Sequence, residues 1–170
     1  MNVNYVKYLI SLSQKGKKNS FIELCEMNLK PVYILVGRTL GDEKITNEVV
    51  KHVFLSAWQN IRFVRDDISI TSWLRSIAVF EIMEELRNRA SRKKVYAKPG
   101  SQIHNPIKTT NETEKQIQEL PELERAVFVL HDIEGYSSHE ISGFFDDVNP
   151  VEVRNILKIA RQKLAEQIIL

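Results

Sequence analysis

The last third of the chain restricts the possible folds most, because proline and glycine punctuate a series of short helical patterns there. Pro121 stands where a missing N–H group costs nothing, and apolar residues then recur at helical spacing up to a stop at Gly135. Asn149 can cap a later helix, and Pro150 fits the first position of that helix. This order of signals predicts a helix-turn-helix.

The final helix of this pattern has two chemically different faces. The apolar stripe consists of Val153, Leu157, Ala160 and Leu164, and the polar side consists of Arg154, Asn155, Lys158 and Arg161. Such a helix can lie in the DNA major groove, where amide and guanidinium groups read base edges and basic groups contact phosphates. A solvated surface helix has the same pattern, so this face alone leaves both interpretations open.

Length and composition set outer limits on the fold and its surroundings. A chain of 170 residues can form one ordinary domain or two small helical ones. Cys25 is its only cysteine, which excludes an internal disulfide framework and is typical of a reducing compartment. No leader pattern opens the chain, and no stretch approaches the roughly 20 apolar residues of a membrane span. We therefore expect a soluble cytoplasmic protein without membrane insertion.

Periodicity and composition divide the chain into two helical parts. Residues 91–113 lose hydrophobic periodicity and collect Lys, Pro, Gly, Ser and Thr, which predicts a flexible linker between a domain over 1–90 and one over 114–170. Before the linker, four segments have helical periodicity: 5–14, about 20–40, 44 or 46 to 61, and 71 or 72 to about 89. Because no alternating strand pattern of useful length is present, the predicted class is all-α.

Signatures of catalysis are missing from the sequence. The chain has no Gly-rich phosphate loop, no closely spaced Cys and His set, and no Gly-x-Ser-x-Gly nucleophile pattern. Its four histidines are scattered over different predicted elements, so a metal site would need distant segments to meet. We expect no enzymatic activity, no catalytic residues, no metal and no cofactor. The net charge of +2 is too small to indicate nucleic-acid binding from bulk electrostatics.

Two series of residues, one in each predicted domain, occur in an order that resembles a known family. The first series is Leu40-Gly41-Asp42, Val49-Val50, Val53-Phe54-Leu55, Ala57-Trp58, Ser72-Trp73-Leu74, Ile77-Ala78 and Leu86-Arg87. The second is Leu120-Pro121, Arg125, Val127, Leu130, Glu134-Gly135, Ser137, Glu140-Ile141, Val153, Leu157, Ala160-Arg161 and Leu164. Both series, in this order and with this linker length, resemble a bacterial RNA polymerase sigma factor of the extracytoplasmic-function group.

The resemblance implies three binding surfaces and no chemistry. The first domain would bind the clamp helices of the polymerase core through Glu48, Val49, Lys51, His52, Phe54 and Leu55. It would capture the unwound minus-ten element of promoter DNA through Arg62, Phe63, Arg65, Trp73, Arg75, Arg87 and Arg89. The second domain, also expected to meet the polymerase flap, would hold the minus-thirty-five element through Arg154, Asn155, Ser137, His139, Lys158 and Arg161. An anti-sigma factor is a further expected partner.

Two other functions remain compatible with the sequence. One is a sigma-like interaction protein that binds an anti-sigma factor or modifies polymerase without acting as a productive sigma factor. Departures from the family pattern favour it, namely Lys51, His52, Phe80, Glu81, Ile156 and Ile159. The other is a helix-turn-helix repressor that acts without polymerase, which would leave the first domain without a role.

Overall fold

The computed structural model describes residues 3–65, 67–95, 106–107, 109–145 and 148–169. The secondary structure of these residues is helical, with one isolated β-bridge between Asp42 and Pro106, which confirms the predicted all-α class. Two compact units divide the chain: unit 1 contains Met1–Val36 and Lys44–Glu85, and unit 2 contains Gly37–Glu43 and Leu86–Leu170. The centre of the predicted linker, residues 96–105, and Lys108 lie outside the described residues.

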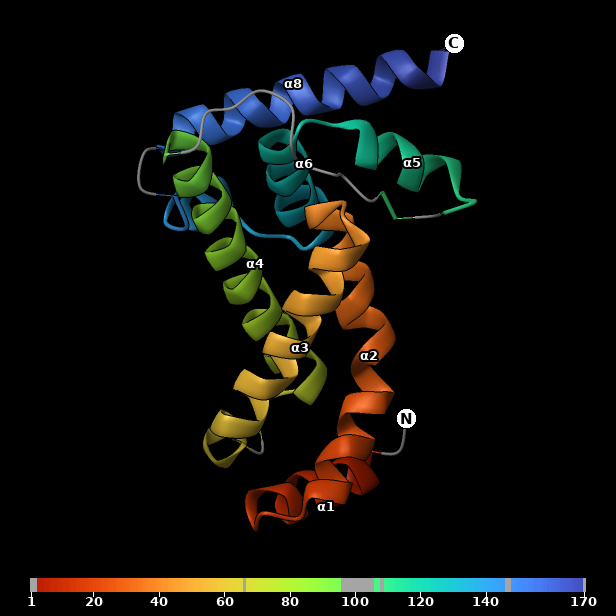
Figure 1. Ribbon diagram of the computed structural model, residues 1–170, viewed down its shortest axis with the longest axis vertical. Coiled ribbons are helices and arrows are strands. Elements are labelled where there is room, and N and C mark those ends of the chain that lie inside the picture. The colour runs from red at the N-terminus through yellow and green to blue at the C-terminus, as the bar shows by residue number, and fades with distance from the viewer. Residues whose placement is uncertain (1–2, 66, 96–105, 108, 146–147, 170) are drawn as a thin grey trace. The chain divides into compact units, whose positions relative to one another are not determined.

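Four helices, drawn from red to green in Figure 1, begin the chain. They are α1 (Val3–Gln14), α2 (Lys18–Leu40), α3 (Glu43–Asn60) and α4 (Ile70–Val95), with a 3₁₀ turn at Ile61–Phe63 after α3. All four correspond to segments with predicted helical periodicity, although α4 extends six residues beyond Arg89. The last turn of α2 and the part of α4 from Leu86 onward belong to unit 2.

The core of unit 1 is built from the apolar stripes of its helices. Leu24, Val53 and Ile82 are almost fully buried, and the rings of Phe21 and Trp58 lie 5.0 Å apart. The pattern of α2 also predicts an inward Leu29, which is wrong, because this side chain is 47% exposed.

A buried amide explains the outward position of Leu29. Asn28 takes the inward position of this turn, where its Nδ2 donates to the Leu24 carbonyl at 2.8 Å. Its Oδ1 accepts from the Thr71 hydroxyl at 2.8 Å, so Asn28 connects α2 to the start of α4. A buried polar side chain is tolerated here because both ends of the amide have a partner.

Unit 2 contains the predicted helix-turn-helix. Its elements are α5 (Glu112–Glu119), α6 (Glu122–Phe128), a π-helical turn (Val129–Ile133), α7 (Ser138–Ser142) and α8 (Pro150–Ile169). The long α8, blue in Figure 1, packs against α6 and α7 through Val153, Leu157 and Ala160, all of which are buried. The sequence did not predict α5 or the π-helical turn.

The predicted end signals have the expected conformations with one small difference. Asn149 caps α8, since its Oδ1 accepts from the backbone N–H groups of Val151 and Glu152 at 2.9 and 3.1 Å, and Pro150 is the first helical residue. Gly135 has a φ of 81°, the left-handed conformation that ends the preceding turn. Pro121 was predicted to be the first helical residue, but it is the N-cap residue of α6, one position earlier.

A buried arginine organises the interior of unit 2. Arg125 is 5% exposed, and its guanidinium donates four hydrogen bonds to backbone carbonyls. Its Nε and Nη2 reach the carbonyls of Thr39 and Leu40, both at 2.9 Å, while Nη1 reaches those of Gln118 and Leu120 at 2.8 and 3.1 Å. The guanidinium therefore caps the C-terminal end of α2, where the helix dipole favours a positive charge. Burial lowers the pKa of Arg125.

Candidate nucleic-acid interface

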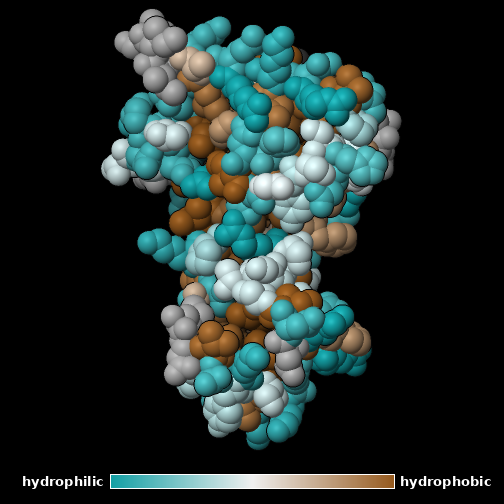
Figure 2. Space-filling view, turned by 180° about the vertical axis from the view of Figure 1, so that it is seen from behind, coloured by the Kyte–Doolittle hydropathy of each residue, from teal (hydrophilic) through white to brown (hydrophobic). Residues whose placement is uncertain are grey.

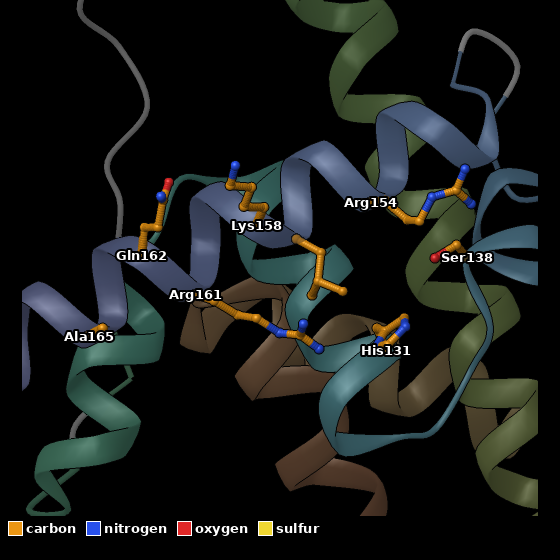
Figure 3. A pocket seen from close by; sticks show the side chains of 8 residues that line it. His131, Ser138, Arg154, Lys158, Arg161, Gln162 and Ala165 are labelled. Carbon is orange, nitrogen blue, oxygen red and sulfur yellow. The ribbon is translucent and has the colours of Figure 1, made fainter.

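A groove lies along the face of α8 that looks toward the turn after α6. Its lining residues are His131, Ser138, Arg154, Leu157, Lys158, Arg161, Gln162 and Ala165. Four of these eight carry basic side chains and none carries a carboxylate, so the groove suits an anion. Figure 3 shows Arg161 extending from α8 toward His131, and Arg154 beside Ser138. Five of the eight lining residues are Arg, Lys, Ser or Gln, which are residue types that contact DNA backbones.

An ion pair fixes one wall of this groove. Asp132 accepts from Arg161 twice, from Nε at 2.9 Å and from Nη2 at 2.6 Å. The Asp132 carboxylate also lies 2.8 Å from Nδ1 of His131. The hydrogen bonds from Arg161 are the main reason why the pKa of Asp132 is lowered, and His131 adds to the effect. Because the ionised carboxylate can only accept, Nδ1 is the ring nitrogen of His131 that carries a proton.

A capping box sets the start of α7, at the other wall. The Ser137 Oγ accepts from the Glu140 backbone N–H at 3.2 Å, and the Glu140 Oε2 accepts from the Ser137 N–H at 2.8 Å. These bonds to Ser137 lower the pKa of Glu140. The polar atoms of Ser137 are thus engaged within α7, whereas the next residue, Ser138, lines the groove. The phosphate contact predicted for Ser137 stays a prediction.

The other predicted contacts of the helix-turn-helix are only partly brought together. Arg154, Lys158 and Arg161 line the same groove, as the spacing of α8 predicts. Asn155 is exposed but does not line the groove, since it lies on the side of α8 opposite its buried stripe. His139 is exposed on α7 and is also absent from the lining.

Two arginines predicted for the minus-ten element belong to unit 2. Arg89 is buried at 9% exposure and pairs with Glu122, with 2.6 Å between Nη1 and Oε1. Arg87 is half-buried and donates from Nη1 to the Phe144 carbonyl at 3.4 Å. These contacts give both side chains a structural role inside unit 2. Their DNA contacts stay predictions.

Sequence reasoning missed several residues of the groove. His131 lines it from the π-helical turn, Ser138 from the start of α7 and Gln162 from α8. Asp132 holds Arg161. No local pattern connects Asp132 to Arg161, because 29 residues separate them. The available signal was the helical spacing of Arg154, Lys158 and Arg161 along α8, which indicates that Gln162 lies on the same face.

In unit 1, the turn after α3 displays two of the predicted DNA contacts. The Arg62 guanidinium carbon lies 4.7 Å from the centre of the Phe63 ring, which is 64% exposed. Gln14 of α1 supports this turn, because its Nε2 donates to the carbonyls of Ile61 and Val64 at 3.3 and 3.0 Å. An exposed aromatic ring with a cation over its face is a surface on which an unpaired base can stack.

The connection that follows contributes to a second groove in unit 1. Arg65 lies in its lining with Lys7 of α1, above apolar residues such as Val6 and Ile70. The Arg65 side chain is held by Asp67, with bonds of 3.1 and 2.9 Å from Nε and Nη2. The remaining two residues predicted for this surface, Trp73 and Arg75, are half-buried on α4.

The residues predicted to bind polymerase lie on two different sides of α3, one exposed and one facing the core. Glu48, Lys51 and His52 are exposed, and Leu55 is 55% exposed although it is apolar. Val49 is only 4% exposed and packs into the core of unit 1, while Phe54 is half-buried. Apolar side chains also reach the surface elsewhere, and Figure 2 shows several such patches on one face of the molecule.

Comparison with protein families gives two matches in the same order as the two predicted domains. Residues 24–92 match the family model "Sigma-70 region 2", and residues 110–164 match "Sigma-70, region 4". Together the two matched segments cover more than two thirds of the chain. The chain belongs to the sigma-70 family of RNA polymerase sigma factors. Its function is that of an extracytoplasmic-function sigma factor, which directs RNA polymerase core to promoters and initiates transcription there.

Solved structures share the fold of this sigma factor. One is the sigma factor RpoE in complex with the anti-sigma factor NepR from Bartonella quintana, with 15% identity and a TM-score of 0.61 over 88% of this chain and 97% of that chain. Another is CnrH in complex with the cytosolic domain of CnrY, with 19% identity and a TM-score of 0.51 over 96% and 97% of the two chains. A comparison with curated protein sequences finds no match.

The described part of this sigma factor holds no group of three or more His, Cys, Asp or Glu side chains that could bind a metal ion. Among the same residues, none of the helices has the length and apolar character that spanning a bilayer requires.

Proposed function

We propose that this sigma factor divides promoter recognition between its two units. In this proposal the groove on α8 holds the backbone of the minus-thirty-five element, and the turn after α3 stacks an unwound base of the minus-ten element. The observation that carries it is the groove itself, where His131, Arg154, Lys158 and Arg161 meet without any carboxylate in the lining. Each Lys or Arg that contacts a phosphate releases a counterion, so the three Lys and Arg side chains of this groove favour DNA over a neutral ligand.

For polymerase binding we propose the exposed side of α3. Leu55 offers an apolar anchor on that side, and the exposed Glu48, Lys51 and His52 supply a polar surround. Apolar anchors enclosed by polar rims dominate the energetics of helix-mediated interfaces. Val49 supports this surface from within the core, and the partner is the coiled coil of the polymerase clamp, with the flap as the contact for unit 2.

The chemistry of transcription belongs to the polymerase core in this proposal. The sigma factor contributes binding and positioning only, which agrees with the nature of its family as a regulator of transcription. We accordingly place it in the cytoplasm together with the polymerase and assign it no catalytic residue.

An anti-sigma factor is the remaining proposed partner. One of the two solved structures named above holds a sigma factor in complex with an anti-sigma factor, and the other holds CnrH in complex with the cytosolic domain of CnrY. Exposed apolar side chains such as Leu55 and Phe63 give such a protein a surface to cover. A small protein that binds here would compete with polymerase and DNA.

Binding to core polymerase tests the proposal at its first step. The Leu55→Asp variant places a charge at the proposed anchor, whereas Gln59→Glu changes charge at an exposed position one turn further along α3. We expect wild type and Gln59→Glu to bind core and to support promoter-dependent transcription, and Leu55→Asp to lose at least tenfold in core affinity, as hot-spot side chains do. Equal core binding by all three proteins would contradict the role of α3.

The anti-sigma proposal needs a separate measurement. A protein that copurifies with this sigma factor from its own cells is expected to suppress transcription when it is added back in equimolar amount. It is also expected to be displaced by excess core polymerase. Suppression that persists in saturating core would show a different kind of inhibitor.

A further inference from the structure

The turn between α1 and α2 gathers basic side chains. Lys15, Lys17 and Lys18 fall within four consecutive residues, and all three are exposed. The first acidic residue of the chain is Glu23, so no carboxylate precedes this turn in the sequence. Among the residues that the structure describes, the three side-chain amino groups have no hydrogen-bond or ion-pair partner. Their charge is therefore available to an external anion.

Backbone hydrogen bonds fix the shape of this turn. The N–H group of Gly16 donates to the Ser13 carbonyl at 2.9 Å, and that of Lys17 donates to the Leu12 carbonyl at 3.0 Å. Gly16 has a φ of 82°, in the left-handed region that glycine adopts without strain. The lysine side chains thus start from a backbone of defined conformation.

The last residue of α1 connects the basic turn to the surface on which we propose that a base stacks. The Gln14 Nε2 donates to the carbonyls of Ile61 and Val64 at 3.3 and 3.0 Å, and α1 packs against the 3₁₀ turn after α3. Arg62 and the exposed ring of Phe63 stand between these two carbonyls in the sequence. Both turns lie at the lower end of unit 1 in Figure 1. The lysines and the ring therefore belong to one region of unit 1.

The stability of α2 does not account for these lysines. Lys18 is the first residue of α2, and the first turn of this helix contains no acidic residue. A positive charge at the N-terminal end of a helix is unfavourable, because the helix dipole is positive there. A structural role for Lys17 and Lys18 in capping this helix is therefore excluded, whereas a negatively charged partner would benefit from them.

We propose that the α1–α2 turn binds phosphates of the unwound minus-ten strand, next to the base that stacks on Phe63. Proteins bind single-stranded nucleic acid through a basic track beside aromatic stacking positions, and unit 1 brings these two elements together. Lysine contacts phosphates without reading bases, so the turn adds affinity but no sequence preference. The match to sigma-70 region 2 begins at residue 24, so this contact lies outside the matched segments. The inference rests on the proposed stacking at the turn after α3.

The test uses the sigma factor assembled with core polymerase and a promoter fork in which one strand of the minus-ten element is unpaired. A second fork carries methylphosphonate linkages in that strand, which removes the phosphate charges and keeps the bases. The test variants are the pair Lys17→Gln, Lys18→Gln and the same pair with Lys15→Gln added. The pair Lys30→Gln, Lys44→Gln removes two charges from exposed positions elsewhere in unit 1 and is the matched control.

Each lost phosphate contact lowers the salt slope of single-strand binding by about 0.7. Between about 50 and about 200 mM salt, we therefore expect wild type to lose about sevenfold more affinity than the test pair and about twentyfold more than the triple variant. On the methylphosphonate fork, wild type and the triple variant are expected to bind equally. The test variants should unfold at the same urea concentration as wild type or a slightly higher one, since a charge is removed from the start of α2.

Two results would overturn the inference. If the test pair and the control pair lose the same affinity, the net charge of the protein is responsible and not the turn. If wild type still binds the methylphosphonate fork more tightly than the triple variant does, the lysines do not contact these phosphates.

Phe63→Ala separates the failure of this inference from the failure of the proposed stacking. We expect this variant to bind the unmodified fork at least about fivefold more weakly than wild type. Unchanged binding would overturn the stacking proposal together with the inference that rests on it. Weakened binding by Phe63→Ala, with wild-type behaviour of the triple variant, would overturn only the role of the α1–α2 turn.

Discussion

Asp132 and Arg161 join the first helix of the helix-turn-helix to the recognition helix through two hydrogen bonds of 2.9 and 2.6 Å. The pair determines where the guanidinium of Arg161 stands in the α8 groove, because both oxygens of Asp132 are engaged by it. A side chain that is positioned before DNA arrives loses less conformational entropy on binding. Asp132 thus contributes to the interface as a positioning residue, although it carries the charge that repels phosphate.

Removal of this pair should have a small effect on stability. Arg161 is more than half exposed, so the expected loss in the free energy of unfolding for Asp132→Asn is only about 0.5 kcal/mol. A double-mutant cycle with Arg161→Gln, followed by urea unfolding, measures the coupling between the two side chains. A coupling of about 2 kcal/mol or more would mean that the pair is shielded from solvent to an extent that this structure does not show.

The stabilisation from Asp132 should depend on pH in one direction. The folded-state pKa of this carboxyl is lowered below its ordinary value of 3.8, chiefly by Arg161, so the ionised form stabilises the fold above that value. The contribution is then lost as the pH falls through the lowered pKa. We expect the stability difference between wild type and Asp132→Asn to shrink as the pH falls below roughly pH 4. A difference that grows on acidification below that pH would contradict the ion pair.

The two neighbouring serines of α7 should respond differently to alanine. Ser137→Ala removes the N-cap and should cost about 1 kcal/mol of stability. Ser138→Ala should leave stability within about 0.5 kcal/mol but weaken DNA binding by about fivefold, since its side chain lines the groove. Thermal unfolding and promoter-binding titrations of both variants separate the roles, and reversed effects would assign the groove contact to Ser137.

Gly41 should tolerate no side chain, for two independent reasons. Its φ of 68° is strained for any other residue, and a Cβ atom would lie 2.7 Å from Cζ of Arg125. Four hydrogen bonds prevent that guanidinium from moving aside. Gly135 is the matched control, because its φ of 81° carries the same strain in open space. We expect Gly135→Ala to cost about 1 kcal/mol and Gly41→Ala at least about 1 kcal/mol more. Equal costs, measured by urea unfolding, would show that Arg125 does not enforce the glycine.

Local signals in the sequence were sufficient for the helices other than α5 and the π-helical turn. Asn149, Pro150 and Gly135 mark helix ends through their own backbone and side-chain chemistry, so their roles are readable from the sequence. The error at Leu29 has a different cause. The buried amide of Asn28 is satisfied by Leu24 and Thr71, and the second of these partners comes from another helix 43 residues away. Periodicity alone treats any asparagine as outward-facing.

The candidate site was predictable only along α8. Arg154, Lys158 and Arg161 share a helical face, and the structure brings them to one groove. Partners from other elements carry no such spacing, which explains why His131 and Ser138 were missed. An ion pair within the domain was an alternative for Arg161 from the sequence, but the sequence did not identify Asp132 as the partner. The same limitation applies to the pairing of Arg89 with Glu122, which lies 33 residues further along the chain.

Promoter-dependent transcription by an Arg154→Ala, Lys158→Ala double variant tests the central claim most directly. The assay compares it with wild type, and with Lys115→Ala as an exposed basic control on α5, on a promoter with an intact or a scrambled minus-thirty-five element. We predict that the double variant binds core polymerase normally, transcribes from the intact promoter no better than wild type does from the scrambled one, and shows a salt dependence of promoter binding reduced by about two phosphate contacts. Wild-type levels of transcription by the double variant on the intact promoter would contradict the claim that the α8 groove holds promoter DNA.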